Sequence, residues 1–339
     1  MEDKIFEMIN PNDNTKLSKL NKKELNELLY YINQCIIKYR NVLSTDKKST
    51  FGIEIEYETG GIKKVQEALD ELHLGDDWKI KHDGSVSRGG ELATPILTNN
   101  AQNWETLLHV CNVIKKNAQT GLQAGGHIHV GTNILKLKTI NWIKLFYMWM
   151  TYEHIMIRFS SGEYLRARNG LKTYAKPSNK KIYDLLSKET IELHALELEP
   201  ENRSIIEDLI RKYNNQDRYK ALNLMKASIN ESIFDNTFEF RCPNATLEEA
   251  IWQNNINTLV SFLEHLDKLE LEEIKEYFNK VKSCIEYGSL NPNQIYLTQA
   301  IELADLIFDH NIDKIYFLRQ YIKEYKTSLS EKKQICLVR

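Results

Sequence analysis

The sequence is short of cysteine, of net charge and of long apolar runs. Its five cysteines lie far apart and form no CxxC pair, so neither a thiolate zinc site nor a disulfide framework is indicated. The formal net charge of −2 gives no basic surplus of the kind that indicates a nucleic-acid partner. No apolar run approaches the ~20 residues of a membrane helix, and the acidic, polar N-terminus has no signal-peptide core. We therefore expect a cytoplasmic protein that binds neither nucleic acid nor membrane.

Several common nucleotide-binding and hydrolase motifs are also missing. There is no GxxxxGK[ST] loop, which excludes a Walker-type nucleotide site. The run GLQAGG at residues 121–126 precedes a predicted strand and not a helix, so it is no dinucleotide fingerprint. The HExxH and GxSxG motifs are absent. Any chemistry must come from side chains that separate stretches bring together.

What the sequence does contain is four short runs in which charged and apolar residues alternate. They are FGIEIEY at 51–57, GGELATPIL at 89–97, GGHIHVG at 125–131 and TFEFR at 237–241. Residues two apart in a strand point the same way, so one face of each run is charged and the other apolar. A sheet of such strands would cover its apolar face with helices. Its charged face would repel itself unless cations neutralised it, which predicts a site for several metal ions.

The order of the elements predicts an α+β fold. We expect a mainly antiparallel sheet with helices packed on one face and with helical N- and C-terminal segments. A strand-like run is also predicted at 218–229. Helical spacing of apolar residues is found at 15–44, 62–74, 100–118 and 138–159, and from 246 almost to the end.

Three parts of the chain follow from this order. We predict a helical N-terminal arm over 1–48, a catalytic α+β domain over 49–246, and a helical C-terminal region over 247–339 packed on that domain. The segment 160–181 has two glycines, a proline and six Lys or Arg residues, and it interrupts the pattern. We interpret it as a long ordered loop of the kind that carries function.

Carboxylates on the predicted strands are the first candidate site residues. Glu54 and Glu56 share one face of their strand, which suits a hard cation such as Mg²⁺, although a solvated edge strand has the same pattern. Glu91 is a carboxylate within an apolar run, next to a glycine. Asp83 precedes that run in the turn sequence HDGS, where an aspartate is also a common turn former.

Two histidines and an Arg–Glu pair complete the predicted face. His127 and His129 follow two glycines, which let a bulky group approach the backbone, so either imidazole is a candidate for metal or phosphate contact. Imidazoles with carboxylates also suit zinc or manganese. Glu239 and Arg241 share a face, either as a cross-strand ion pair or as a metal ligand beside a phosphate-binding guanidinium.

The segment 160–181 supplies a basic set of candidates. Arg166, Arg168, Lys172 and Tyr174 form either an exposed basic surface or a segment that closes over an anionic substrate. Asn223, within the run RYKALNL, is not selected by the pattern alone.

Taken together and in this order, the runs resemble a known family. GIEIE, then DGS followed by GGELATPIL, then GGHIHVG, RYKALNL and TFEFR, are similar to the amidoligase family. That family belongs to the superfamily of carboxylate–amine ligases that includes glutamine synthetase and glutamate–cysteine ligase. The resemblance covers about residues 51–246. It implies a curved, glutamine synthetase-like antiparallel sheet and an ATP- and Mg²⁺-dependent enzyme.

The resemblance also assigns roles to single positions. It implies metal ligands at Glu54, Glu56, Glu91 and Glu239, with Asp83 as a further candidate. The histidine facing metal and phosphate falls on His127 or His129, and His129 is favoured because Val-Gly follows it. Arg241 would face phosphate, Asn223 would join the cofactor site, and Arg166, Arg168 and Tyr174 would lie on the substrate side.

The activity implied is the joining of a carboxylate to an amine, which is uphill in water. ATP converts the carboxylate to an acyl phosphate, and phosphoryl transfer depends on positioning and charge neutralisation, here by two or three Mg²⁺ or by Mn²⁺. We expect an amine or amino acid and a carboxylate, free or in a peptide or protein, as substrates. Oligomeric state is left open. The alternatives are a metal-dependent phosphoesterase and a non-catalytic nucleotide-binding module on a ligase scaffold.

Overall fold

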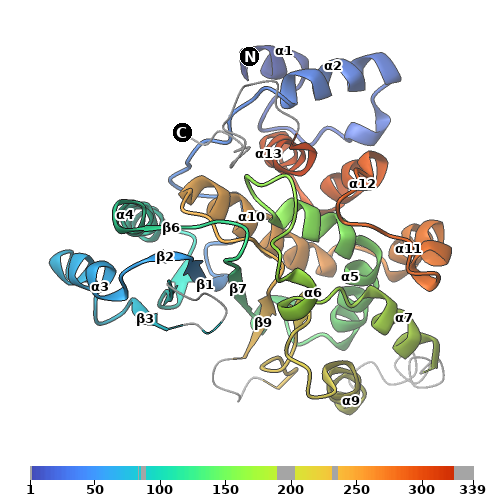
Figure 1. The fold of residues 1–339 in the computed structure, drawn as a ribbon. Helices are drawn as coiled ribbons and strands as arrows, with labels where there is room; N and C mark the ends of the chain where they lie inside the picture. The colour runs from blue at the N-terminus through green and yellow to red at the C-terminus, as the bar shows by residue number, and fades with distance from the viewer. Residues whose placement is uncertain (1, 83, 85–88, 189–202, 231–235, 324–339) are drawn as a thin grey trace.

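An antiparallel sheet lies at the centre of the structure. The computed structural model describes residues 2–82, 84, 89–188, 203–230 and 236–323. Within them a seven-stranded sheet has the order β3-β4-β1-β7-β9-β8, with β5 also pairing with β1, and every pairing is antiparallel (Figure 1). Its strands are β1 (Thr50–Tyr57), β3 (Lys79–Lys81), β4 (Gly90–Ala93), β5 (Leu97–Thr98), β7 (Gly126–Gly131), β8 (Leu222–Asn223) and β9 (Thr237–Phe240). The small strands β2 (Thr59–Gly60) and β6 (Ala118–Gln119) pair separately.

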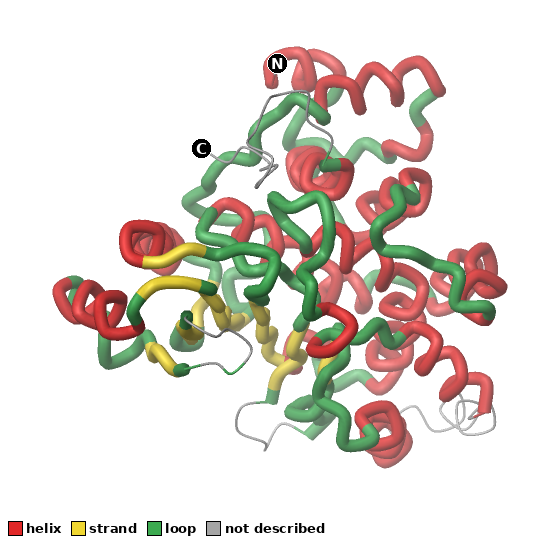
Figure 2. The backbone as a smooth tube through the Cα atoms, in the orientation of Figure 1, coloured by secondary structure: helices red, strands yellow, loops and turns green. Residues whose placement is uncertain are grey.

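In Figure 2 the strands lie in the left and central part of the view, and most helices lie above them and to their right. The described helices are α1 (Glu2–Met8), α2 (Lys22–Ile32), α3 (Ile62–Glu71), α4 (Ala101–Asn117), α5 (Thr139–Ser160), α6 (Leu171–Tyr174), α7 (Asn179–Lys188), α9 (Arg203–Asn214), α10 (Glu249–Glu264), α11 (Leu271–Glu286), α12 (Leu297–Ile307) and α13 (Asn311–Ile322). Short 3₁₀ turns lie at η1 (Leu17–Lys19), η2 (Thr132–Leu135) and η3 (His265–Asp267). The expected combination of an antiparallel sheet with many helices is confirmed.

The apolar face of the sheet is covered by α4, α5 and α10. Ile53, Ile55 and Ile128 are almost fully buried, as their alternation with charged residues predicts. Trp142 and Trp149 of α5 pack on the two phenylalanines of β9, with ring centroids 5.1 and 5.4 Å apart. Packing of this kind fixes which face of each strand is turned away from the helices. It therefore determines where the charged side chains of the same strands lie.

Two expectations about secondary structure were wrong. The helix predicted over 15–44 is confined to α2, because Asn21 and Glu24 form a capping box that starts a new helix there. The chain leaves that helix at Asn33 and runs without a further helix to β1. The strand predicted over 218–229 shrinks to the two residues of β8, since turns follow it directly.

The N-terminal segment is joined to the C-terminal helices by buried polar contacts. Asp305 of α12 accepts hydrogen bonds of 2.9 Å from the backbone N–H groups of Leu17 and Ser18. The fully buried Lys314 lies 3.0 Å from the same carboxylate, and Arg319 donates to the carbonyl of Cys35 at 2.6 Å. Each end of the chain thus satisfies polar groups of the other. The division into three parts stays a prediction. None of the helices described here has the length and apolarity needed to cross a membrane.

One buried histidine in the helical layer predicts a pH dependence of stability. His154 of α5 lies 2.7 Å from Gln299 of α12 through Nε2, and burial lowers its pKa to about 4 in spite of that contact. The unfolded chain, with a histidine pKa of ~6.5, binds a proton first as the pH falls. The free energy of unfolding should therefore drop by about 2 kcal/mol between pH 7.5 and pH 5 because of this residue.

Urea unfolding of the wild type and of His154→Leu at both pH values measures this difference. The variant should lose about 2 kcal/mol less than the wild type over that interval, whatever its stability at pH 7.5. Equal losses in the two proteins would mean that His154 titrates as an exposed histidine does.

Candidate active site

Strand register brings the predicted carboxylates and imidazoles onto one face of the sheet. The pairing of β1 with β7 sets Glu54 opposite His127. The pairing of β7 with β9 sets His129 opposite Glu239, and β8 sets Asn223 opposite Glu239 on its other side. These residues come from four neighbouring strands that are distant in the sequence. The convergence follows from the period of two in each strand together with the antiparallel register.

A second row on the same face runs through β3, β4 and β1. Glu56 lies opposite Glu91, and Lys81 of β3 lies opposite Glu91 on the other side. The Lys81 ammonium is 2.7 Å from Glu91 and 3.8 Å from Glu54. Lys81 was not predicted as a site residue, because the only signal of its strand is an alternation of three residues, Lys-Ile-Lys at 79–81. Asp83 lies outside the described residues.

The two imidazoles stand between carboxylates. Nδ1 of His127 is 2.6 Å from Glu54 and 3.7 Å from Glu239, and its Nε2 is 3.6 Å from Glu56. Nε2 of His129 is 3.6 Å from Glu54. Burial by itself would raise the pKa of the Glu54 carboxyl. The close contacts and charges of both histidines outweigh that effect and hold the pKa well below its ordinary value.

Two groups of side chains on this face can hold a metal ion, and both include Glu54. One group joins Glu54 with His129 and Glu239, and the other joins it with His127 and Glu91. Within each group one ligand atom per residue lies within 4.8 Å of the others. Both histidine Nε2 atoms are buried without a hydrogen bond from any described residue. Buried nitrogens beside carboxylate oxygens are a donor set that suits Mg²⁺, Mn²⁺ or Zn²⁺.

Glu56 has different surroundings from the other carboxylates of this face. It is almost fully buried and accepts a 2.6 Å hydrogen bond from the backbone N–H of Gly125. The guanidinium of Arg168 lies 3.6 Å from the same carboxylate oxygen. Glu56 belongs to neither metal-binding group found among the described residues. Its contacts link β1 to the segment that carries Arg168, and its role as a metal ligand stays a prediction.

The glycines before the histidines admit two side chains of the chain itself. A Cβ on Gly125 would lie 1.6 Å from the guanidinium of Arg168, and one on Gly126 would lie 2.3 Å from the ring of Trp252. Arg168 is buried and donates to the carbonyl of Arg241 at 3.1 Å. The expected close approach to this backbone is therefore real. On the charged face, the group that approaches the backbone at Gly125 is the guanidinium of Arg168. The basic sequence around Arg168 did not indicate that this residue is buried.

Arg241 is fixed by contacts on three sides. It forms an ion pair with Glu239 of β9, two residues earlier in the chain, and not the cross-strand pair that one interpretation of TFEFR predicts. Its Nε donates to the carbonyl of Tyr174 at 3.0 Å, and its guanidinium lies 5.8 Å from the centre of the Tyr219 ring. The guanidinium has five N–H donors, so it retains capacity for an oxygen ligand beside the two metal-binding groups.

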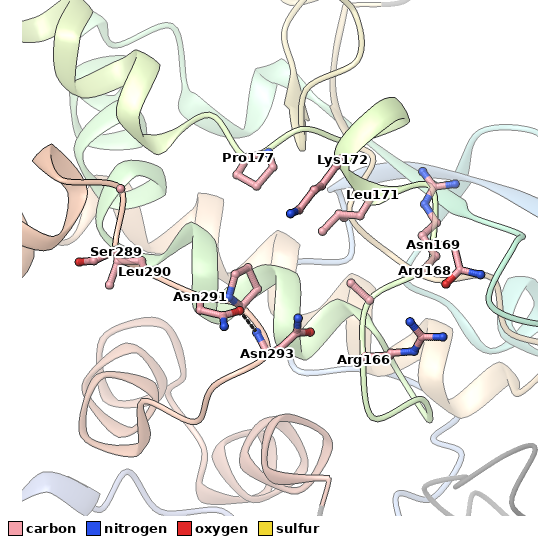
Figure 3. A pocket seen from close by; sticks show the side chains of 13 residues that line it. Arg166, Arg168, Asn169, Leu171, Lys172, Pro177, Ser289, Leu290, Asn291 and Asn293 are labelled. Carbon is pink, nitrogen blue, oxygen red and sulfur yellow. Dashed lines mark hydrogen bonds between the residues drawn. The ribbon is translucent and has the colours of Figure 1, made fainter.

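The basic segment 160–181 contains more helix than the ordered loop predicted from the sequence. It contains α6 and leads into α7. The backbone N–H groups of Ser178 and of Asn179, the first residue of α7, donate to the buried carboxylate of Glu153 at 2.7–2.8 Å. The segment also approaches the site: Tyr174 provides the carbonyl for Arg241, while its ring lies against Tyr219. Arg166 and Lys172 are exposed and line a pocket of about 720 Å³ (Figure 3).

The fit between Gly125 and Arg168 gives a prediction with a matched control. Gly125→Ala should displace the guanidinium and cost about 1–3 kcal/mol of unfolding free energy, as overpacking of a buried site does. Gly52→Ala, on the adjacent strand β1, should change stability by less than about 0.5 kcal/mol, because its Cβ would meet no atom nearer than 3.7 Å. Urea unfolding of both variants measures the contrast. Similar losses would show that Arg168 does not limit this position.

The comparison with known families agrees with the pattern on the strands. A family model described as "putative amidoligase enzyme" matches residues 40–263, and this region contains every strand and both metal-binding groups described above. No curated protein matches the chain. Because the family match covers 224 of the 339 residues, the chain belongs to the amidoligase family.

Proposed function

We propose that this protein is an ATP- and Mg²⁺-dependent ligase that joins a carboxylate to an amine through an acyl phosphate. Family membership supports ligase activity. The observation that carries the finer proposal is the position of Glu54 in both groups of metal-binding side chains. Two such groups on one sheet face match the need of a triphosphate for more than one divalent ion. We also propose that the sheet is of the curved, glutamine synthetase-like kind.

The metal ligands in this proposal are Glu54, Glu91 and Glu239, with one histidine in each group. Bound Mg²⁺ ions would neutralise the phosphate oxygens and hold the triphosphate in place. His127 and His129 would each turn Nε2, the nitrogen without a described hydrogen bond, to the ion or to a phosphate oxygen. Asn223 donates to Glu239 and would keep that carboxylate oriented.

Arg241 is the proposed catalytic residue for phosphoryl transfer. A carboxylate oxygen of the substrate bonds to the γ-phosphorus and ADP leaves with the electron pair of the broken P–O bond. The guanidinium of Arg241, kept in place by the Tyr174 carbonyl and Glu239, would bind the oxygens of the transferred group. The amine then attacks the acyl carbon, loses a proton and expels phosphate. Arg168 would act as a positioning residue through Glu56 and the Arg241 carbonyl.

Loss of Glu54 should remove divalent-ion binding, because both groups share this residue. Calorimetric titration with Mn²⁺ should show at least a roughly tenfold weaker affinity for Glu54→Gln than for the wild type. Glu67→Gln, an exposed change of the same kind on α3, should bind as the wild type does. Equal affinity in Glu54→Gln would place the metal elsewhere.

Turnover provides the direct test of the ligase. The wild type is incubated with ATP, Mg²⁺, glutamate or a glutamyl peptide, and hydroxylamine as the amine, and ADP and hydroxamate are measured. Glu54→Gln and Arg241→Ala should each lose at least roughly 100-fold in rate, as enzymes do when a charge-stabilising group is removed. Glu67→Gln again serves as the control.

Two further measurements on the same protein, of phosphoester hydrolysis and of ATP binding, can reject the proposal. Hydrolysis of phosphoesters in the absence of ATP would favour a metal-dependent phosphoesterase on the same carboxylate–imidazole face. Tight binding of ATP with Mg²⁺, but no ADP release with any acid and amine, would favour a non-catalytic nucleotide-binding module.

A further inference from the structure

A pocket lies beside the proposed site, between two segments that are far apart in the sequence. One wall is the basic segment around α6, with Arg166, Asn169 and Lys172. The other wall is residues 288–293, the connection between α11 and α12. Figure 3 shows the two walls facing each other, with the ammonium of Lys172 extending into the space between them. The volume of about 720 Å³ lies in the range of sites that enclose a ligand larger than a single functional group.

The charge of this pocket has one sign. Arg166, Arg168 and Lys172 contribute to its lining, and none of its described lining residues is acidic. The Arg168 guanidinium turns away to Glu56, so the exposed cations are Arg166 and Lys172. Two cations at one wall, in a protein whose net charge is −2, are an unbalanced local field that attracts an anion.

The remaining lining indicates what kind of anion fits. Asn169, Asn291 and Asn293 present amides, which both donate to and accept from a peptide backbone. Leucine and proline side chains of both walls offer apolar area for aliphatic stems, as in Leu171 and Pro292. No described lining residue is aromatic, so the pocket has no surface on which nucleic-acid bases would stack. These features favour a peptide with several carboxylates over a nucleic acid.

The pocket is connected to the metal-binding face through one short helix. Leu171 and Lys172 of α6 line the pocket, and Tyr174, at the end of the same helix, binds Arg241 through its carbonyl. Arg168 also connects the two places, because it lines the pocket and its guanidinium lies 3.6 Å from Glu56. A ligand in the pocket would thus contact the same elements that position the proposed catalytic guanidinium.

We propose that this pocket binds an acidic peptide segment and thereby presents the carboxylate that is to be joined. The inference rests on the proposed function and gives the substrate class that the family match leaves open. Residues 288–293 lie beyond the family match at 40–263. The pocket thus combines a basic wall from within the family match with a wall from the C-terminal region outside it.

Binding of a labelled peptide tests the inference without nucleotide or metal. Fluorescein-labelled tetraglutamate is titrated with protein, and anisotropy is followed at low salt. Lys172→Glu and Arg166→Glu should each weaken binding roughly tenfold, because a carboxylate then meets a like charge. Asn291→Asp should weaken it as well, which tests the wall from the C-terminal region. Lys64→Glu, an exposed lysine of α3 with the same charge change, should bind as the wild type does.

Three outcomes would overturn the inference. Equal weakening by Lys64→Glu would mean that net charge, and not the pocket, attracts the peptide. Displacement of the peptide by ATP or by single-stranded RNA at equal concentration would assign the pocket to a nucleotide or nucleic acid. Equal binding of tetraglutamine would remove the role of the carboxylates. Circular dichroism shows whether each variant is folded. If Lys172→Glu or Arg166→Glu does not fold, Asn291→Asp provides the test of the pocket in its place.

The failure of this inference differs from the failure of the proposed function. If the wild type consumes ATP with a free amino acid but does not bind tetraglutamate, the ligase stands and the pocket assignment falls. If tetraglutamate binds as predicted but no acid supports ADP release, the pocket stands as a peptide site and the ligase falls.

Discussion

Repulsion between carboxylates on one sheet face is the constraint on which the rest of this structure depends. Each of the four has a compensating neighbour on its own or an adjacent segment: His127 for Glu54, Gly125 and Arg168 for Glu56, Lys81 for Glu91, and Arg241 for Glu239. Isolated like charges at these separations would raise one another's pKa values and favour protonation. The compensation instead keeps Glu54, the residue that both groups share, strongly acidic. An ionised carboxylate in a preformed group is what a hard divalent ion requires.

This compensation exists only in one strand register. A shift of one residue between β1 and β7 would turn Glu54 and His127 to opposite faces and bury charge among the helices. The aromatic packing of α5 against β9, through Trp142 and Trp149, opposes such a shift from the other side of the sheet. The apolar core and the charged face are thus two consequences of one alternating pattern, because a register shift would displace the side chains of both faces at once.

The same alternation explains which parts were predictable from the sequence. The long strands and their charged residues were found because a period of two is visible in a single run. The short strand with Lys81 was missed, since three residues carry too little pattern, and the cap at Asn21 was overlooked within a longer apolar periodicity. Burial of Arg168 could not be inferred, because it depends on the carbonyl of Arg241 and on the absence of a side chain at Gly125. Such contacts arise from tertiary packing between segments remote in sequence.

The sheet and the connection at 288–293 are fixed in place by different kinds of contact. The metal-binding groups depend on backbone ladders within 50–240, so their geometry tolerates little change. The pocket wall at 288–293 is a connection between two helices that are anchored elsewhere, α12 through Asp305 to the N-terminal segment. Substitutions in that connection leave the register of the sheet untouched. Under the proposed function, changes at 288–293 would therefore alter the peptide preference while the proposed metal ligands on the sheet stay in place.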